Sequence, residues 1–136
     1  MSSNVQDFTA RYDAIEAGPE LVAIFGIDAS TAIQRRRFVS TARATGHLLS
    51  NSTAYIPLDI VAPNPAALDD RNEPWPGGTQ HQFLTLGVEI TLVVDEVTAR
   101  MPTTVEAQQW NLPDGVPLLL CRRISSGAHN RVVESR

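Results

Sequence analysis

The chain has 136 residues, the length of one ordinary domain, and its 43% hydrophobic and 19% charged residues are typical of a soluble globular protein. A net charge of −4, from 11 basic residues that are all arginine and 15 acidic residues, argues against specific DNA binding by this chain alone. No apolar run reaches the roughly 18 residues of a membrane-spanning helix, and Met1–Phe8 lacks the apolar core of a secretory signal. We therefore expect a cytoplasmic protein with no membrane contact.

The first 60 residues predict one helix and at least two strands. Residues 5–16 alternate weakly between polar and apolar side chains and could form an edge strand or a lead-in segment. Pro19–Phe25 is predicted to be a short helix, because proline suits a first helical turn and Gly26 can end it. Thr31–Thr41 is predicted to be a strand, and a turn near residues 44–46 leads into a second strand, His47–Ile60.

Three consecutive arginines, Arg35, Arg36 and Arg37, lie in the middle of the first of these two strands. Strand alternation places Arg35 and Arg37 on one face and Arg36 on the other. Two guanidinium groups on one face can bind a carboxylate or phosphate bidentately. The alternative is a solvated strand face on which the arginines form salt bridges with other side chains.

The rest of the chain predicts short helices between strands. Residues 62–76 read as a proline-rich loop with one helical turn at Pro65–Leu68. The elements predicted after it are a helix at Gly77–Leu86, a strand at Val88–Ala99, a helix at Pro102–Trp110 with a capping box of Thr103 and Glu106, and strands at Val116–Ser125 and Val132–Glu134 joined by a turn at Gly127–Asn130. This order predicts a single α+β domain with a mainly antiparallel sheet.

Cysteine and histidine give no sign of a catalytic or metal site. The single cysteine, Cys121, ends the apolar run 116–121 and is predicted to be a buried small hydrophobic residue. The three histidines are scattered, with no His, Cys or Asp cluster at ligand spacing. We expect no metal, no cofactor and no catalytic residue.

Four segments, taken in order, resemble the UTRA domain, which is the ligand-binding half of HutC-type GntR transcription regulators. They are Ser52–Asp59 with its Tyr-x-Pro ending; Pro76–Gly78 opening a helix that ends at Leu86–Gly87; Glu96–Thr103 followed by Glu106–Ala107 and Leu112–Pro117; and Arg122–Arg123 followed by Val133–Glu134. The resemblance covers roughly residues 15 to 134.

The resemblance implies a chorismate-lyase-like fold, in which helices pack against an antiparallel sheet and a pocket binds a small molecule. It implies that residues 1–136 form one effector-binding domain, without the winged helix-turn-helix that precedes it in relatives. It also implies that a final C-terminal strand is missing. Homodimerisation is expected, with the strand Val88–Ala99 presenting one face to the partner, and DNA contact only through the absent N-terminal domain.

The resemblance also implies where the effector binds. Members of the family use basic residues on the strand of Arg35 and Arg37, so these two arginines are expected to project into the pocket. Hydroxyl groups of the next strand and single residues from three other segments complete the expected site: Ser52, Thr53, Tyr55, Gly78, Arg100 and Glu134. For Arg100, a structural role that ties its strand to the capping-box helix is the favoured interpretation.

Two other functions remain open from the sequence. The same fold includes a lyase that cleaves an aromatic carboxylate, and an enzyme would need a general acid or base, for which Glu96 and Glu134 are the candidates. Neither glutamate has a recognisable partner in the sequence. The other alternative is a dimerisation module with a vestigial pocket. We expect a sensory domain rather than an enzyme.

Overall fold

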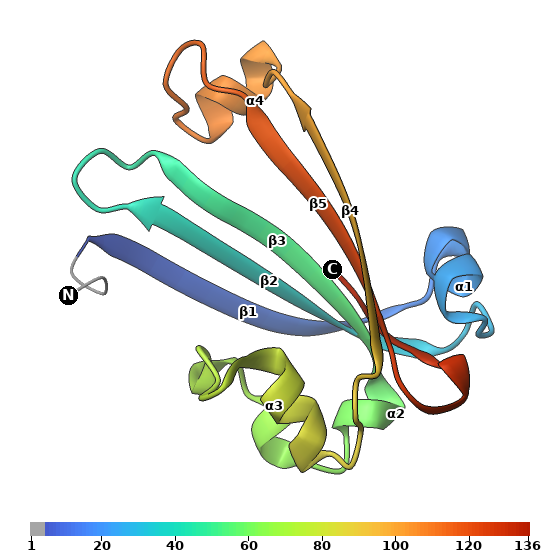
Figure 1. The fold of residues 1–136 in the computed structure, drawn as a ribbon. Coiled ribbons are helices and arrows are strands. Elements are labelled where there is room, and N and C mark those ends of the chain that lie inside the picture. Colours follow the sequence, from blue (N-terminus) through green and yellow to red (C-terminus); the bar gives the residue numbers. More distant parts are fainter. Residues whose placement is uncertain (1–4) are drawn as a thin grey trace.

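The computed structural model describes residues 5–136 and contains one six-stranded antiparallel sheet with short helices (Figure 1). The strands are β1 (Gln6–Glu16), β2 (Ala32–Ala42), β3 (Leu48–Pro57), β4 (Leu92–Arg100), β5 (Leu118–Ser126) and β6 (Val132–Ser135). The helices are α1 (Pro19–Phe25), α2 (Leu58–Val61), α3 (Gly78–Thr85) and α4 (Thr104–Gln109). Short 3-10 turns occupy Pro65–Leu68, Asp70–Asn72 and Ala128–Asn130. The predicted α+β class with an antiparallel sheet is confirmed.

The strand order is β1-β2-β3-β6-β5-β4, so the C-terminal strand lies inside the sheet between β3 and β5. β1 is an edge strand that pairs with β2 along its whole length, from Gln6 opposite Ala42 to Glu16 opposite Ala32. Of the two interpretations of residues 5–16, the edge strand is therefore confirmed. The free edge of β1 is partly covered, because the backbone N–H of Tyr12 donates to Asp70 at 3.1 Å.

The two faces of the sheet have different cover. We call the face that carries α2, α3 and the 3-10 turns of residues 65–72 the helical face, and the opposite face, covered only at one end by α1, the open face. On the helical face the buried core contains Ile56, Ile60, Val61, Ala67, Phe83 and Val133. Under α1 a second cluster contains Ala17, Leu21, Phe25 and Ile33. Full burial of a side chain such as Phe83 contributes about 1.5–3 kcal/mol.

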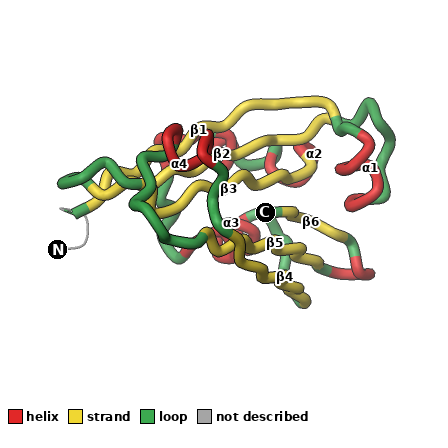
Figure 2. The backbone as a smooth tube through the Cα atoms, turned by 90° about the horizontal axis from the view of Figure 1, so that it is seen from above, coloured by secondary structure: helices red, strands yellow, loops and turns green. Residues whose placement is uncertain are grey.

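The sheet divides into two parts that differ in packing. We call β4, α4 and β5 with their connection, residues 92–126, the arm, and the remaining described residues the body. Both apolar clusters lie in the body and contain no residue of the arm. β6 has only four residues, so β3 and β5 separate beyond it (Figure 1). Figure 2 shows β4 and β5 on the opposite side of β6 from β1, β2 and β3.

The arm rejoins the body at its far end. The backbone N–H of Leu48 donates to the carbonyl of Trp110 at 3.1 Å, and the Asn111 side chain donates to the carbonyl of Thr45 at 2.9 Å. The α4 helix begins with the predicted capping box, in which Thr103 and Glu106 each accept from the other's backbone N–H. None of the helices among residues 5–136 is long and apolar enough to cross a membrane.

Three local predictions were wrong. Cys121 is exposed rather than buried, because its strand lies in the arm, which contributes no residue to either apolar cluster. The second predicted strand stops at Pro57, which has no N–H for a further ladder bond, and Leu58–Val61 forms α2. The strand predicted at Val88–Ala99 begins only at Leu92, because Val88 and Ile90 leave the sheet to pack on the helical-face core.

Candidate functional site

Arg35 and Arg37 lie side by side on the open face of the sheet. In the pairing of β2 with β3, Arg35 is opposite Tyr55 and Arg37 is opposite Thr53, so all four side chains share this face. Arg36 is buried on the helical face, as the alternation predicts. The structure therefore brings together four of the eight residues expected at the effector site.

Asp13 of β1 is the partner of both open-face arginines. Arg35 donates from Nε to Oδ1 of Asp13 at 2.9 Å and from its Nη2 to the other carboxylate oxygen, and Nη2 of Arg37 lies 3.9 Å from the same oxygen. The hydrogen bonds from Arg35 hold the pKa of the Asp13 carboxyl below its ordinary value, and they raise the pKa of Arg35. The pair is partly open to solvent, with 47% of the Asp13 side chain exposed.

A cavity of about 500 Å³ adjoins this row of side chains, between α1 and the open face. Thr53 and Tyr55 line it, together with Ser135 of β6, Arg122 of β5 and apolar side chains of α1. A second hollow of about 290 Å³ shares Ile24 and Arg122 with the first. The first cavity, of about 500 Å³, is large enough for a small metabolite, since ligand pockets span about 300–1,000 Å³.

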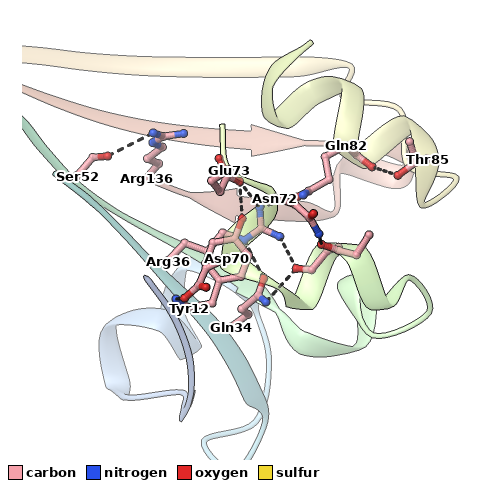
Figure 3. A network of polar contacts seen from close by, with 12 residues as sticks. Tyr12, Gln34, Arg36, Ser52, Asp70, Asn72, Glu73, Gln82, Thr85 and Arg136 are labelled. Atoms are coloured by element: carbon pink, nitrogen blue, oxygen red, sulfur yellow. Dashed lines mark hydrogen bonds and ion pairs between the residues drawn. The ribbon is translucent and has the colours of Figure 1, made fainter. Parts of the chain in front are cut away.

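Arg36 is the centre of a buried polar network on the helical face (Figure 3). Its side chain is 1% exposed and donates to Gln34, to Gln82 and to the carbonyl of Ala67. The guanidinium also lies over the ring of Tyr12, 4.5 Å from its centroid. Burial lowers the pKa of Arg36, and burial together with the hydrogen bond to Glu73 raises the pKa of Tyr12. These contacts give Arg36 a structural role.

Ser52 and Glu134 lie on the helical face, away from Arg35 and Arg37. Ser52 accepts from Nη2 of Arg136 at 3.3 Å (Figure 3). The guanidinium of Arg136 lies over the ring of Phe38. Glu134 is 4% exposed, and its Oε2 has no hydrogen-bond partner among the described residues. Burial raises the pKa of this carboxyl.

Gly78 and Arg100 occupy two further places. Gly78 begins α3 with a φ of 80°, on the helical side of the sheet. Arg100 donates both terminal nitrogens to Glu106, at 2.6 and 2.7 Å, and so ties the end of β4 to α4. That contact is the structural role favoured for Arg100. The eight expected residues therefore occupy the open face, the helical face, the start of α3 and the arm, and do not line one pocket.

Two open-face residues escaped the sequence reasoning. Asp13 and Arg11 belong to β1, where Asp13 is opposite Arg35 and Arg11 is opposite Arg37. Arg11, Asp13 and Ile15 alternate along the chain, which indicates that they share one strand face. This pattern predicts their place near Arg35 and Arg37 only if residues 5–16 are known to pair with β2. Within residues 5–136 no group of three or more His, Cys, Asp or Glu side chains could hold a metal ion.

Known proteins resemble this chain in sequence and in fold. The family model described as the UTRA domain matches residues 9–136. A solved structure described as a GntR-family transcriptional regulator is similar over 96% of this chain, with a TM-score of 0.75 and 19% identity. This chain spans about half of that protein, 52% of its length.

Two other solved structures are similar to this chain to a comparable degree. The effector domain of PhnF from Mycobacterium smegmatis gives a TM-score of 0.66 at 16% identity, over 98% of this chain and 80% of that one. A GntR-family transcriptional regulator from Enterococcus faecalis gives 0.74 at 13% identity, over 95% and 88%. Identities this low establish a shared fold. A comparison with curated proteins gives no match.

Proposed function

The chain belongs to the UTRA domain family, and on that premise we propose that it is the effector-sensing domain of a HutC-type GntR transcription regulator. A small anionic metabolite binds on the open face, and binding controls the DNA contact of a separate N-terminal domain. Effector binding changes DNA affinity only if the two conformations differ in affinity for the effector. The similar structures are described as GntR-family regulators, which supports this assignment.

The observation that carries the proposal is the convergence of Arg35 and Arg37 on one carboxylate. Both guanidinium groups point at Asp13, beside a cavity of about 500 Å³. An arrangement that already holds a carboxylate has the donor geometry that carboxylate and phosphate groups require. Thr53 and Tyr55 add hydroxyl groups to the same face and line the cavity, so they would bind the uncharged part of the effector.

The remaining expected residues have other roles in this proposal. Ser52 positions Arg136, Arg100 holds α4, and Gly78 allows the backbone turn at the start of α3. Glu134 is buried on the helical face and does not line the cavity or the second hollow of the open face. An enzyme is less well supported. Glu134 lies on the helical face, and Glu96 lines the second hollow but not the cavity beside Arg35 and Arg37. Turnover of chorismate by the purified protein would contradict the sensory assignment.

The arm supports homodimerisation. Leu92, Val94, Val97 and Leu119 are all exposed, although two-stranded β structure is marginal without cover. Leu92 and Val94 lie on one face of the arm, and Val97 and Leu119 on the other. A second copy that packs on either face would bury part of this apolar surface, and the protein would act in the cytoplasm as a dimer. Sedimentation velocity at micromolar concentration should show the dimer, and a monomer that persists at high concentration would contradict it.

The effector site is tested by calorimetry with inorganic phosphate and with anionic metabolites. A hydrogen bond to a charged group contributes roughly 1.5–3 kcal/mol, so Arg37→Ala should weaken binding about ten- to a hundred-fold. Arg43→Ala is the matched control, because Arg43 forms an ion pair with Asp7 of β1 but lies at the far end of the strands. Equal affinity in the wild type and in Arg37→Ala would reject the site.

A further inference from the structure

Two aspartates of β1 form ion pairs with arginines outside β1, and the two pairs differ in kind. Among residues 5–136, Asp7 forms an ion pair with Arg43 only, with Nη2 of Arg43 2.9 Å from Oδ1. Asp13 accepts two hydrogen bonds from Arg35 and lies 3.9 Å from Arg37. Asp7 therefore has an ordinary surface pair, whereas Asp13 occupies a position between two converging cations.

The surroundings of Asp13 are richer in positive than in negative charge. Arg11 is opposite Arg37 in the pairing of β1 with β2, so Arg11, Arg35 and Arg37 share the open face. We call these three arginines the arginine patch. Two of them, Arg35 and Arg37, form ion pairs with the Asp13 carboxylate. Like charges on neighbouring strands destabilise a sheet unless a counter-ion lies between them.

The Asp13 carboxylate also lies beside the cavity. Ile15, two residues further along the same face of β1, lines it, and so does Tyr55, which is opposite Arg35. An anionic group of a molecule in the cavity would reach Arg35 from the side on which Asp13 is exposed. It would then compete with the Asp13 carboxylate for the same N–H donors.

We propose that Asp13 is the resident counter-ion of the arginine patch, and that an effector's anionic group binds by displacing the Asp13 carboxylate from Arg35. This inference rests on the proposed effector site and adds its regulation. Asp13 lowers the affinity of the site for every anion, so that only a ligand that also fills the cavity binds well. Displacement also breaks a side-chain link between the edge strand β1 and β2, so binding is coupled to the position of β1.

The test uses inorganic phosphate as the probe and residues 1–136 as the protein, at constant ionic strength. Asp13→Asn keeps the shape of the side chain and removes its charge. An exposed ion pair contributes up to about 1 kcal/mol, so Asp13→Asn should bind phosphate up to about five-fold more tightly than the wild type. Asp7→Asn is the matched control, and its affinity should equal that of the wild type.

A second measurement follows the Asp13 carboxyl in the wild-type protein and needs no variant. Saturating phosphate should raise the pKa of the Asp13 carboxyl in the wild type, because the displaced carboxylate loses the arginine that lowers its pKa. Carbon-detected NMR of the aspartate carboxyl groups follows this directly. The carboxyl signal of Asp7 is the internal control and should not respond to phosphate.

The possible outcomes distinguish this inference from the proposed effector site on which it rests. If phosphate binds the wild type and Arg37→Ala weakens binding, but Asp13→Asn binds no better, the displacement is wrong and the effector site stands. If phosphate binds neither the wild type nor Asp13→Asn, both proposals are wrong. If phosphate binds while the Asp13 pKa stays low, the anion does not compete with Asp13, and the inference is overturned.

Discussion

The body and the arm belong to one sheet but use their apolar side chains differently. In the body, Phe83 is 1% exposed and packs with Ile56 and Val61 against the helical face. In the arm, Leu119 is 76% exposed, and all nine residues of β4 are exposed. Both regions show apolar residues at strand spacing in the sequence. Alternation thus tells which side chains share a face, but not whether another element covers that face.

The largest expected effect of a single substitution is in the core of the body. Phe83→Ala should lower the free energy of unfolding by about 3–5 kcal/mol, because it leaves a cavity in the helical-face core. Leu119→Ala in the arm should change it by less than about 0.5 kcal/mol in the monomer, because that side chain is already exposed. Denaturant unfolding at low protein concentration measures both. Equal losses would show that the arm is packed as tightly as the body.

The next comparison uses arginines. Arg36→Ala removes the hub of the buried network. The side-chain oxygens of Gln34 and Gln82 lose their arginine donor and Glu73 loses its nearby cation, which should cost about 3–5 kcal/mol. Arg123 of the arm forms an ion pair with Asp95 at 2.7 Å, but both side chains are partly exposed. Arg123→Ala should therefore cost at most about 1 kcal/mol.

Chemical denaturation of the two arginine variants distinguishes these roles. A loss of stability in Arg36→Ala no larger than in Arg123→Ala would mean that the buried network is not a structural centre. In that case Arg36 would become a candidate for ligand binding on the helical face.

The sequence predicted much of this arrangement and missed the rest for physical reasons. The opposite faces of Arg35 and Arg36, the capping box of Thr103 and Glu106, and the UTRA family are all local patterns, and each is confirmed. Which face carries helices depends on contacts between distant segments, such as Gln34 with Ala67. Asp13 was missed for the same reason, since its partners are on another strand.

The exposure of Cys121 and the position of Glu134 were also beyond local patterns. Cys121 follows a run of leucines that resembles a core strand, but no element packs an apolar cluster on this part of the arm. The pairing of β5 with β6 shifts register between Ser125 and Ser126, so simple alternation does not fix the face of a β6 residue such as Glu134.

The smallest expected effect is at the start of α4, in the arm. Hydrogen bonds from Arg100 and from the Thr103 backbone lower the pKa of Glu106 from 4.5 to about 2. A carboxyl whose pKa is lower in the folded state stabilises that state above its unfolded pKa, and this contribution disappears as the pH falls toward about 2. Glu106→Gln should therefore weaken α4 at pH 7 and have no effect below about pH 2.

Amide NMR of Thr103 and Glu106 against pH measures this effect locally. Because the arm has no buried core, the loss should be confined to α4 and should leave the body unchanged. A titration of these amides near pH 4.5, the ordinary value for glutamate, would contradict the hydrogen-bonding pattern.

The central claim is that the open face of the body is the effector site, and mapping anion binding on the amide NMR spectrum tests it most directly. Titration with phosphate should shift amides near Asp13, Arg35, Arg37, Thr53 and Tyr55, which all face the same side of the sheet. Amide signals of α3, such as those of Gln82 and Phe83, should move little, because that helix lies on the helical face. Shifts concentrated on the helical face, or none in the body, would contradict the account.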